Sequence, residues 1–250
     1  MSTLSAKVKY GFWFFRKGYF NQMLFMLKNK HNKHMDTQSV SWCKSQAIST
    51  HEFLKALGIK KHQIKSDYPS YYEYARSKEL DCPFDMDKGV APDILYSLIK
   101  ELRPKFIIET GVAYGWSSLA ILLGINKNHK AHLWSIDMPY PNLGNESYVG
   151  CILPDDLHDK WTLIRKPDIS GLPIALNECG LIDFFHYDSD VSYDGKMNAA
   201  RMVWLNLRMG GYIMSANIQN NHAFKDFCDS VKRDPLIVKT GSNYIGLIKK

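Results

Sequence analysis

The feature that most constrains the fold is an alternation of short apolar strands and helices that begins at about residue 86. Apolar runs predict strands at 106–109, 132–137, 161–165, 182–188 and 212–215, and helical patterns occupy 91–102, 117–125, 195–207 and 223–231. Such alternation is typical of a parallel sheet that is covered by helices on both faces. We therefore expect an α/β fold of the Rossmann-like, doubly wound type.

The end of the chain departs from a plain doubly wound pattern. Two further strands, at 236–240 and 244–249, are joined by the short turn Gly241-Ser242-Asn243. Strands joined by so short a turn must be antiparallel neighbours. We expect a mostly parallel, seven-stranded sheet that ends in an antiparallel hairpin, within a main domain at 86–250.

Residues 1–85 are predicted to be a helical N-terminal extension and a cap on the substrate side. The 32 basic and 25 acidic residues give a net charge of +7, and residues 1–35 hold seven Lys or Arg and no acid. The remaining 215 residues therefore have a net charge of zero. A general nucleic-acid-binding surface is not expected, because the excess charge is confined to one segment.

Residues 1–35 are also rich in aromatic side chains, including the run Phe12–Phe15. Their apolar clusters are shorter than the core of a signal peptide, and no run in the chain approaches the roughly 18 apolar residues of a membrane span. Two interpretations stay open. Either the segment lies on an anionic membrane surface, at the inner face, or on an acidic partner, or it packs on the main domain or across a homodimer.

The five cysteines are scattered and include no CxxC pair. This pattern argues against a disulfide framework and against a structural zinc site, and it fits a reducing compartment. We expect a cytoplasmic protein.

The loop after the first predicted strand has the composition of a ligand-binding turn. It contains Gly111 and Gly115 between Glu109 and a helix. Gly111 permits a sharp turn, and Gly115 lets a ligand approach backbone N–H groups near the start of the helix. The Gly-x-x-x-Gly spacing differs from that of dinucleotide sites, and an acid at the strand end suits a cationic or hydroxyl-bearing ligand.

Acidic residues follow three more strands, at Asp137, Asp168 and Asp188. Because parallel strands end at one edge of a sheet, these acids are expected to face a single crevice, where Asp137 can bind both hydroxyls of a ribose. Any one of them has a simpler alternative role as a helix cap.

The segment Phe106–Ser118 (FIIETGVAYGWSS) resembles the cofactor loop of class I S-adenosylmethionine-dependent methyltransferases. The spacing of the acids and the pair Lys88-Gly89 are similar to those of catechol and caffeoyl-CoA O-methyltransferases. Residues 182–227 resemble bacterial methyltransferases of glycan and natural-product clusters. The resemblance covers about residues 86–250.

The resemblance implies methyl transfer from S-adenosylmethionine to a hydroxyl of a small molecule such as a sugar or secondary metabolite. It implies that Glu109 lies near the amino-acid part of the cofactor, Asp137 at the ribose, Asp168 beside the adenine and Asp188 near the transferred methyl. The implied cofactor-binding set is Lys88, Gly89, Glu109, Thr110, Gly111, Ala113, Gly115, Ser117, Ser118, Asp137, Met138, Asp168 and Asp188.

The chain departs from these families where they carry the chemistry. Val191 stands where they have a Lys or His base, and Ala216-Asn217 replaces a pair that binds a divalent cation with the earlier Asp. Asp188 and Asn217 alone make a poor Mg²⁺ site, because hard cations prefer several oxygen ligands.

Three interpretations follow from these departures. The chain is a metal-independent methyltransferase with a substitute base, a catalytically degenerate cofactor-binding or interaction module, or an enzyme whose acceptor is already nucleophilic. The candidates for a substitute base are Asp190, His222, His186 and Tyr193, and Asp188 and Asp190 remain candidate catalytic carboxylates.

Overall fold

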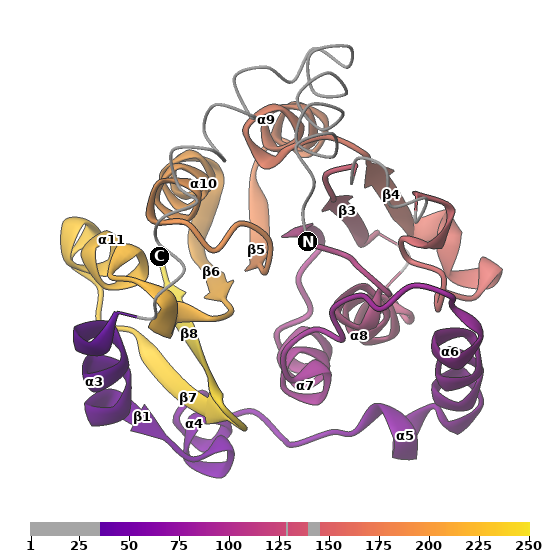
Figure 1. Cartoon of the computed structure of the whole chain (residues 1–250), viewed down its shortest axis with the longest axis horizontal. Helices are drawn as coiled ribbons and strands as arrows, with labels where there is room; N and C mark the ends of the chain where they lie inside the picture. The colour runs from indigo at the N-terminus through magenta and orange to yellow at the C-terminus, as the bar shows by residue number, and fades with distance from the viewer. Residues whose placement is uncertain (1–35, 129, 140–145) are drawn as a thin grey trace, which may run out of the picture.

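The computed structural model describes residues 36–128, 130–139 and 146–250. The predictions for residues 1–35 lie outside this part of the chain. Eight strands form one sheet in the order β1-β7-β8-β6-β5-β2-β3-β4 (Figure 1). Their bounds are β1 (Ala47–Ile48), β2 (Phe106–Thr110), β3 (His132–Ile136), β4 (Trp161–Ile164), β5 (Ile182–Tyr187), β6 (Leu207–Ser215), β7 (Leu236–Thr240) and β8 (Asn243–Lys249).

The doubly wound, mostly parallel sheet is confirmed. Strands β2 to β6 pair in parallel, whereas β8 is antiparallel to both β6 and β7. Each of the seven predicted strands is present. The eighth, β1, is only two residues long and pairs in parallel with β7 through Ala47 and Ile237, so residues 1–85 contribute a strand as well as helices.

Helices cover both faces of the sheet (Figure 1). One face packs against α4 (Thr50–Ala56), α5 (Ile64–Asp67), α6 (Pro69–Asp81), α7 (Pro92–Leu102) and α8 (Trp116–Ile125). The other packs against α3 (Thr37–Gln46), α9 (Asp168–Cys179), α10 (Tyr193–Asn206) and α11 (Ala223–Val231).

The two cores follow the alternation of side chains along each strand. Ile107 and Phe184 enter the core beneath α7 and α8, while their neighbours Ile108 and Phe185 enter the core beneath α9 and α10. All four are fully buried. The strands read as continuous apolar runs because both of their faces are covered.

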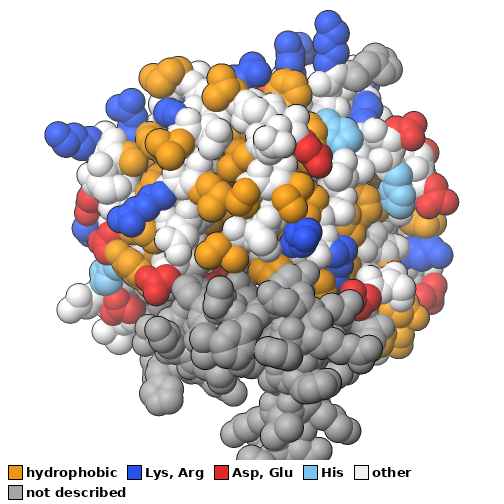
Figure 2. Space-filling view, turned by 90° about the horizontal axis from the view of Figure 1, so that it is seen from above, with side chains coloured by type: hydrophobic (Ala, Val, Ile, Leu, Met, Phe, Trp, Pro, Cys, Tyr) orange, Lys and Arg blue, Asp and Glu red, His pale blue; other side chains and the backbone are white. Residues whose placement is uncertain are grey.

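Helix α9 is not among the elements that the sequence predicts. It contains Pro173, a residue that ordinarily interrupts a helix. Figure 2 shows the molecule from above, with apolar side chains over the middle of this face and Lys and Arg side chains among and around them. Over the described chain as a whole, the exposed apolar residues include Ile169, Leu181, Leu205 and Met209.

None of the described helices is long and apolar enough to cross a membrane.

Strand β8 depends on a glycine for its packing against α11. A Cβ built on Gly246 would overlap the ring of Phe224, which is 4% exposed. We expect Gly246→Ala to lower the free energy of unfolding by about 1–3 kcal/mol, because a forced overlap in a packed core moves side chains off their preferred rotamers. Urea unfolding followed by circular dichroism measures the change.

Phe224→Leu provides the matched control for this overlap. The smaller side chain makes room for the new methyl group, so the double variant should lose less stability than the sum of the two single variants. Strictly additive losses would show that Phe224 is not the obstacle.

Candidate functional site

The loop after β2 is held against the end of β5 by its first glycine. Gly111 has φ +84°, and a Cβ at this position would overlap the carbonyl oxygen of Asp188. The N–H of Asp188 donates to the carbonyl of Thr110 (2.9 Å), and the N–H of Gly111 donates to the carbonyl of Ile136 (2.9 Å). The ends of β2, β3 and β5 are therefore fastened together at one point.

Asp137, after β3, fixes the rest of this loop. Its Oδ2 accepts hydrogen bonds from the backbone N–H groups of Val112 (2.8 Å) and Ala113 (3.1 Å). Its Oδ1 accepts one from Nη1 of Arg165 (2.7 Å). The carboxylate is 3% exposed, and these three donors satisfy a charge that burial would otherwise penalise. The expected role at a ribose stays a prediction.

Asp168 reaches the same loop through a hydroxyl. Ser189 donates a hydrogen bond to Oδ2 of Asp168, and its oxygen lies 3.0 Å from Oγ1 of Thr110. The pKa of Asp168 is raised to about 7, mainly by burial; the nearby charges of Asp190 and Asp137 act in the same direction, and the hydrogen bond from Ser189 opposes them. The structure thus brings Thr110, Gly111, Ala113, Asp137, Asp168 and Asp188 together at the carboxyl edge of the sheet.

The carboxylate of Asp188 meets Asn217 rather than a second acid. Nδ2 of Asn217 donates to Oδ1 of Asp188 (3.2 Å). Burial raises the pKa of Asp188, while His186 and Lys196 favour its charged form. Asp188 is thus a partly desolvated carboxylate with one amide donor.

These residues do not fit a divalent cation. Asn217 presents its nitrogen to Asp188, and Ala216 has no ligating atom in its side chain. In the described part of the chain, no three His, Cys, Asp or Glu side chains are arranged to hold a metal ion. Mg²⁺ and Ca²⁺ require several oxygen ligands, and the side chains of Asp188, Ala216 and Asn217 do not supply them.

Glu109 lies inside the molecule. It is fully buried, and its Oε1 accepts hydrogen bonds from Ser118 and from Ser135 (2.6 Å). Its Oε2 is 3.9 Å from Nδ1 of His186 and has no hydrogen-bond partner. The predicted contact of Glu109 with the cofactor's amino-acid part remains untested, and in this structure the carboxylate anchors α8 and β3.

The remaining predicted cofactor residues surround the start of α8. Gly115 is the N-cap of this helix, and Ser117 in its first turn is 6% exposed. Gly89 lies beside Ser117, since a Cβ on Gly89 would be 3.8 Å from the Ser117 nitrogen. The ammonium of Lys88 instead lies 2.9 Å from Oε1 of Glu79 on α6. Met138 is half-buried after Asp137.

Three of the four candidate bases are engaged in other contacts, whereas His186 is fully buried and its ring nitrogens have no hydrogen-bond partner in the described part of the chain. Nε2 of His222 lies 2.8 Å from Oδ2 of Asp36, and the Tyr193 hydroxyl donates to Asp226 (2.9 Å). Both carboxylate oxygens of Asp190 accept hydrogen bonds from Ser192 at the start of α10. No contact here identifies one of them as a base.

Two charged residues at this edge were missing from the sequence prediction. Arg165, after β4, pairs with Asp137. Lys196, on α10, is 5% exposed and donates from Nζ to the carbonyl oxygens of Ala216 (2.9 Å) and Asn217 (2.7 Å). Burial lowers the pKa of Lys196 to about 8, although Asp188 and Asp190 oppose this shift.

Comparison with known proteins finds a family match for part of the chain. Residues 108–218 match the model of a family described as a methyltransferase domain. No curated protein matches the chain significantly. The family match confirms the methyltransferase resemblance seen in the sequence over residues 108–218.

Solved structures share the fold. An O-methyltransferase from Bacillus cereus in complex with SAH is 13% identical, with a TM-score of 0.55 over 83% of this chain and 100% of that chain. An SAH-bound methyltransferase from Podospora anserina is also 13% identical, with a TM-score of 0.51 over 85% of this chain and 93% of that chain. At such identities the similarity establishes the fold.

The raised pKa of Asp168 predicts a pH-dependent loss of stability. The unfolded chain releases this proton near pH 3.8, whereas the folded chain keeps it to about pH 7. Between these values the folded state binds more protons, so the free energy of unfolding falls as pH rises. We expect the free energy of unfolding of Asp168→Asn to rise by about 4 kcal/mol relative to that of the parent chain between pH 4 and pH 8, since one pKa unit corresponds to about 1.4 kcal/mol.

Urea unfolding at a series of pH values measures this gain. Asp229→Asn, on the exposed face of α11, is the matched control and should follow the pH profile of the parent chain. A constant difference between Asp168→Asn and the parent chain across this range would show that Asp168 titrates normally.

Proposed function

We propose that this chain, whose residues 108–218 match the model of a methyltransferase domain, binds S-adenosylmethionine at the carboxyl edge of its sheet and transfers the methyl group to a hydroxyl of a small molecule. The observation that carries the proposal is the direct contact of three strand ends. The loop at Gly111 abuts Asp188, and its next two N–H groups bind Asp137.

The charge at this edge suits a sulfonium nucleoside. Asp137, Asp168 and Asp188 are concentrated there, and Arg165 pairs with Asp137. A bound sulfonium cation would favour the ionised forms of Asp168 and Asp188, whose pKa values are raised by burial. The SAH reported in the two solved methyltransferases supports a cofactor of this kind.

Methyl transfer from a sulfonium places modest chemical demands on the protein. The acceptor oxygen must lie in line with the methyl–sulfur bond, so alignment supplies much of the rate acceleration. The loop fastened by Gly111 and Asp137 is rigid enough to hold the cofactor for such an alignment. A base near the acceptor would raise the rate further.

A sugar or secondary metabolite is our proposed acceptor. The O-methyltransferase similarity supports a hydroxyl acceptor, and the resemblance of residues 182–227 to glycan and natural-product methyltransferases supports its class. We propose that residues 36–85 and 138–156 build the acceptor pocket; residues 140–145 of this range lie outside the described part of the chain.

A catalytically degenerate, cofactor-binding module is the second candidate. Val191, at the expected position of a base, has half of its side chain exposed to solvent, and Ala216 is buried and apolar. An active enzyme would methylate acceptors from a panel of sugars and phenols with radiolabelled S-adenosylmethionine. Cofactor binding with no transfer to any of them would favour the degenerate module.

Calorimetric titration with SAH tests the proposed cofactor site. We expect the parent chain to bind, and Asp137→Ala to bind at least tenfold more weakly, because a charged hydrogen-bond partner contributes about 1.5–3 kcal/mol. Gly111→Ala should abolish binding, since the added methyl group displaces the loop from Asp188.

The exposed substitution Asp229→Ala serves as the control and should bind as the parent chain does. Circular dichroism confirms that each variant is folded. Unaltered SAH affinity in Asp137→Ala and Gly111→Ala would contradict the proposed site.

A further inference from the structure

We propose that the ammonium group of Lys196 is the resident cation of this site and takes the place of a divalent metal ion. Lys196 is then a positioning residue, which acts on Asp188 and on the backbone of Ala216 and Asn217. The inference rests on the proposed methyltransferase function, and it names a metal-independent form of that site.

The first support is where the ammonium lies. From α10 the Lys196 side chain reaches the end of β6 and donates to the carbonyl oxygens of Ala216 and Asn217. These are the two residues that stand where the resembling families carry their metal-binding pair. Nδ2 of Asn217 donates in turn to Asp188, so a continuous line of contacts links the ammonium to this carboxylate.

The second support is the balance of charge around a buried cation. Lys196 is 5% exposed, and the carboxylates of Asp188 and Asp190 favour its charged form. Cys43, from α3, is the other titratable group that acts in this direction. A buried ammonium requires such partners, and a divalent cation brought beside it would be repelled.

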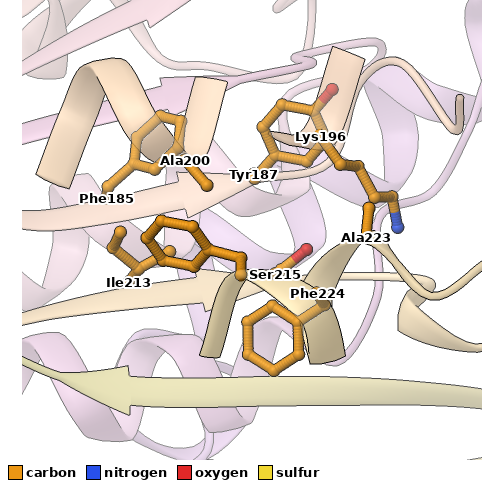
Figure 3. A pocket seen from close by; sticks show the side chains of 9 residues that line it. Phe185, Tyr187, Lys196, Ala200, Ile213, Ser215, Ala223 and Phe224 are labelled. Atoms are coloured by element: carbon orange, nitrogen blue, oxygen red, sulfur yellow. The ribbon is translucent and has the colours of Figure 1, made fainter. Parts of the chain in front are cut away.

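The third support is the shape of the space around Lys196. A cavity of about 10 Å³ adjoins its side chain, between β5, β6, α10 and α11 (Figure 3). Tyr187, Ser215 and Phe224 are among the residues that line it. This volume holds at most about one water molecule, so the packed stem of Lys196 has little room to move away from the carbonyl oxygens of Ala216 and Asn217.

The proposal has a consequence for metal binding, because the Lys196 ammonium and a divalent cation would compete for the same carboxylates. The ammonium supplies positive charge near Asp188 without needing Ala216 to ligate. A carboxylate introduced at residue 216 would therefore pair with Lys196 instead of binding a metal ion. Only when the ammonium is removed as well should the acids at 188 and 216 become available to a divalent cation.

Mn²⁺ binding, measured by the loss of the free-ion signal in electron paramagnetic resonance, tests this exchange. The parent chain and Ala216→Asp should bind no Mn²⁺ stoichiometrically. The double variant Lys196→Met with Ala216→Asp should bind it at least tenfold more tightly than Ala216→Asp alone. Lys196→Arg with Ala216→Asp keeps the positive charge and should again show no binding.

Three results would overturn the inference. They are stoichiometric Mn²⁺ binding by the parent chain, equal binding by Ala216→Asp and the Lys196→Met double variant, and no binding by a folded Lys196→Met double variant. Circular dichroism establishes folding, and if Lys196→Met unfolds the chain, Lys196→Gln replaces it in the double variant.

A parallel SAH titration of the parent chain keeps the two proposals separate. Absence of SAH binding contradicts the proposed function whatever the Mn²⁺ result. SAH binding together with Mn²⁺ binding by the parent chain contradicts only the role of Lys196.

Discussion

The contact between Gly111 and the backbone of Asp188 is the constraint on which the site depends. It exists because a glycine with positive φ lets the loop after β2 turn directly onto the end of β5. Once the loop is there, its next two N–H groups face the carboxylate of Asp137 from β3. Three strands that are separated in sequence thus meet at one turn, and any side chain on residue 111 would separate them.

The acids gathered by this turn are stabilised in different ways. Asp137 has a guanidinium and two backbone donors, so its charge is compensated within the protein. Asp168 has a single hydroxyl donor, and its pKa is raised to about 7. The edge is therefore stable without a ligand, yet it gains from a cation that offsets the remaining negative charge. This property, more than any single residue, favours a sulfonium cofactor.

Much of this arrangement was predictable from local sequence. The strands are continuous apolar runs, and the positions of Asp137 and Asp188 at their ends follow from the geometry of a parallel sheet. Strand β1 was not predictable, because two residues carry no periodic pattern and their pairing with β7 depends on tertiary packing. Helix α9 contains a proline that conceals it.

The burial of Lys196 was not predictable from the sequence. A lysine on a helix is usually solvated, and nothing in residues 193–206 distinguishes Lys196 from an exposed residue. Its burial becomes visible only when α10 is placed against β6 and the carbonyls of Ala216 and Asn217 turn toward it. The apolar side chain of Ala216 and the buried ammonium of Lys196 are each unfavourable for a metal centre. The ammonium and the backbone carbonyls of residues 216 and 217 nevertheless form a satisfied polar cluster, because the lysine donates to both carbonyls and the nearby acids balance its charge.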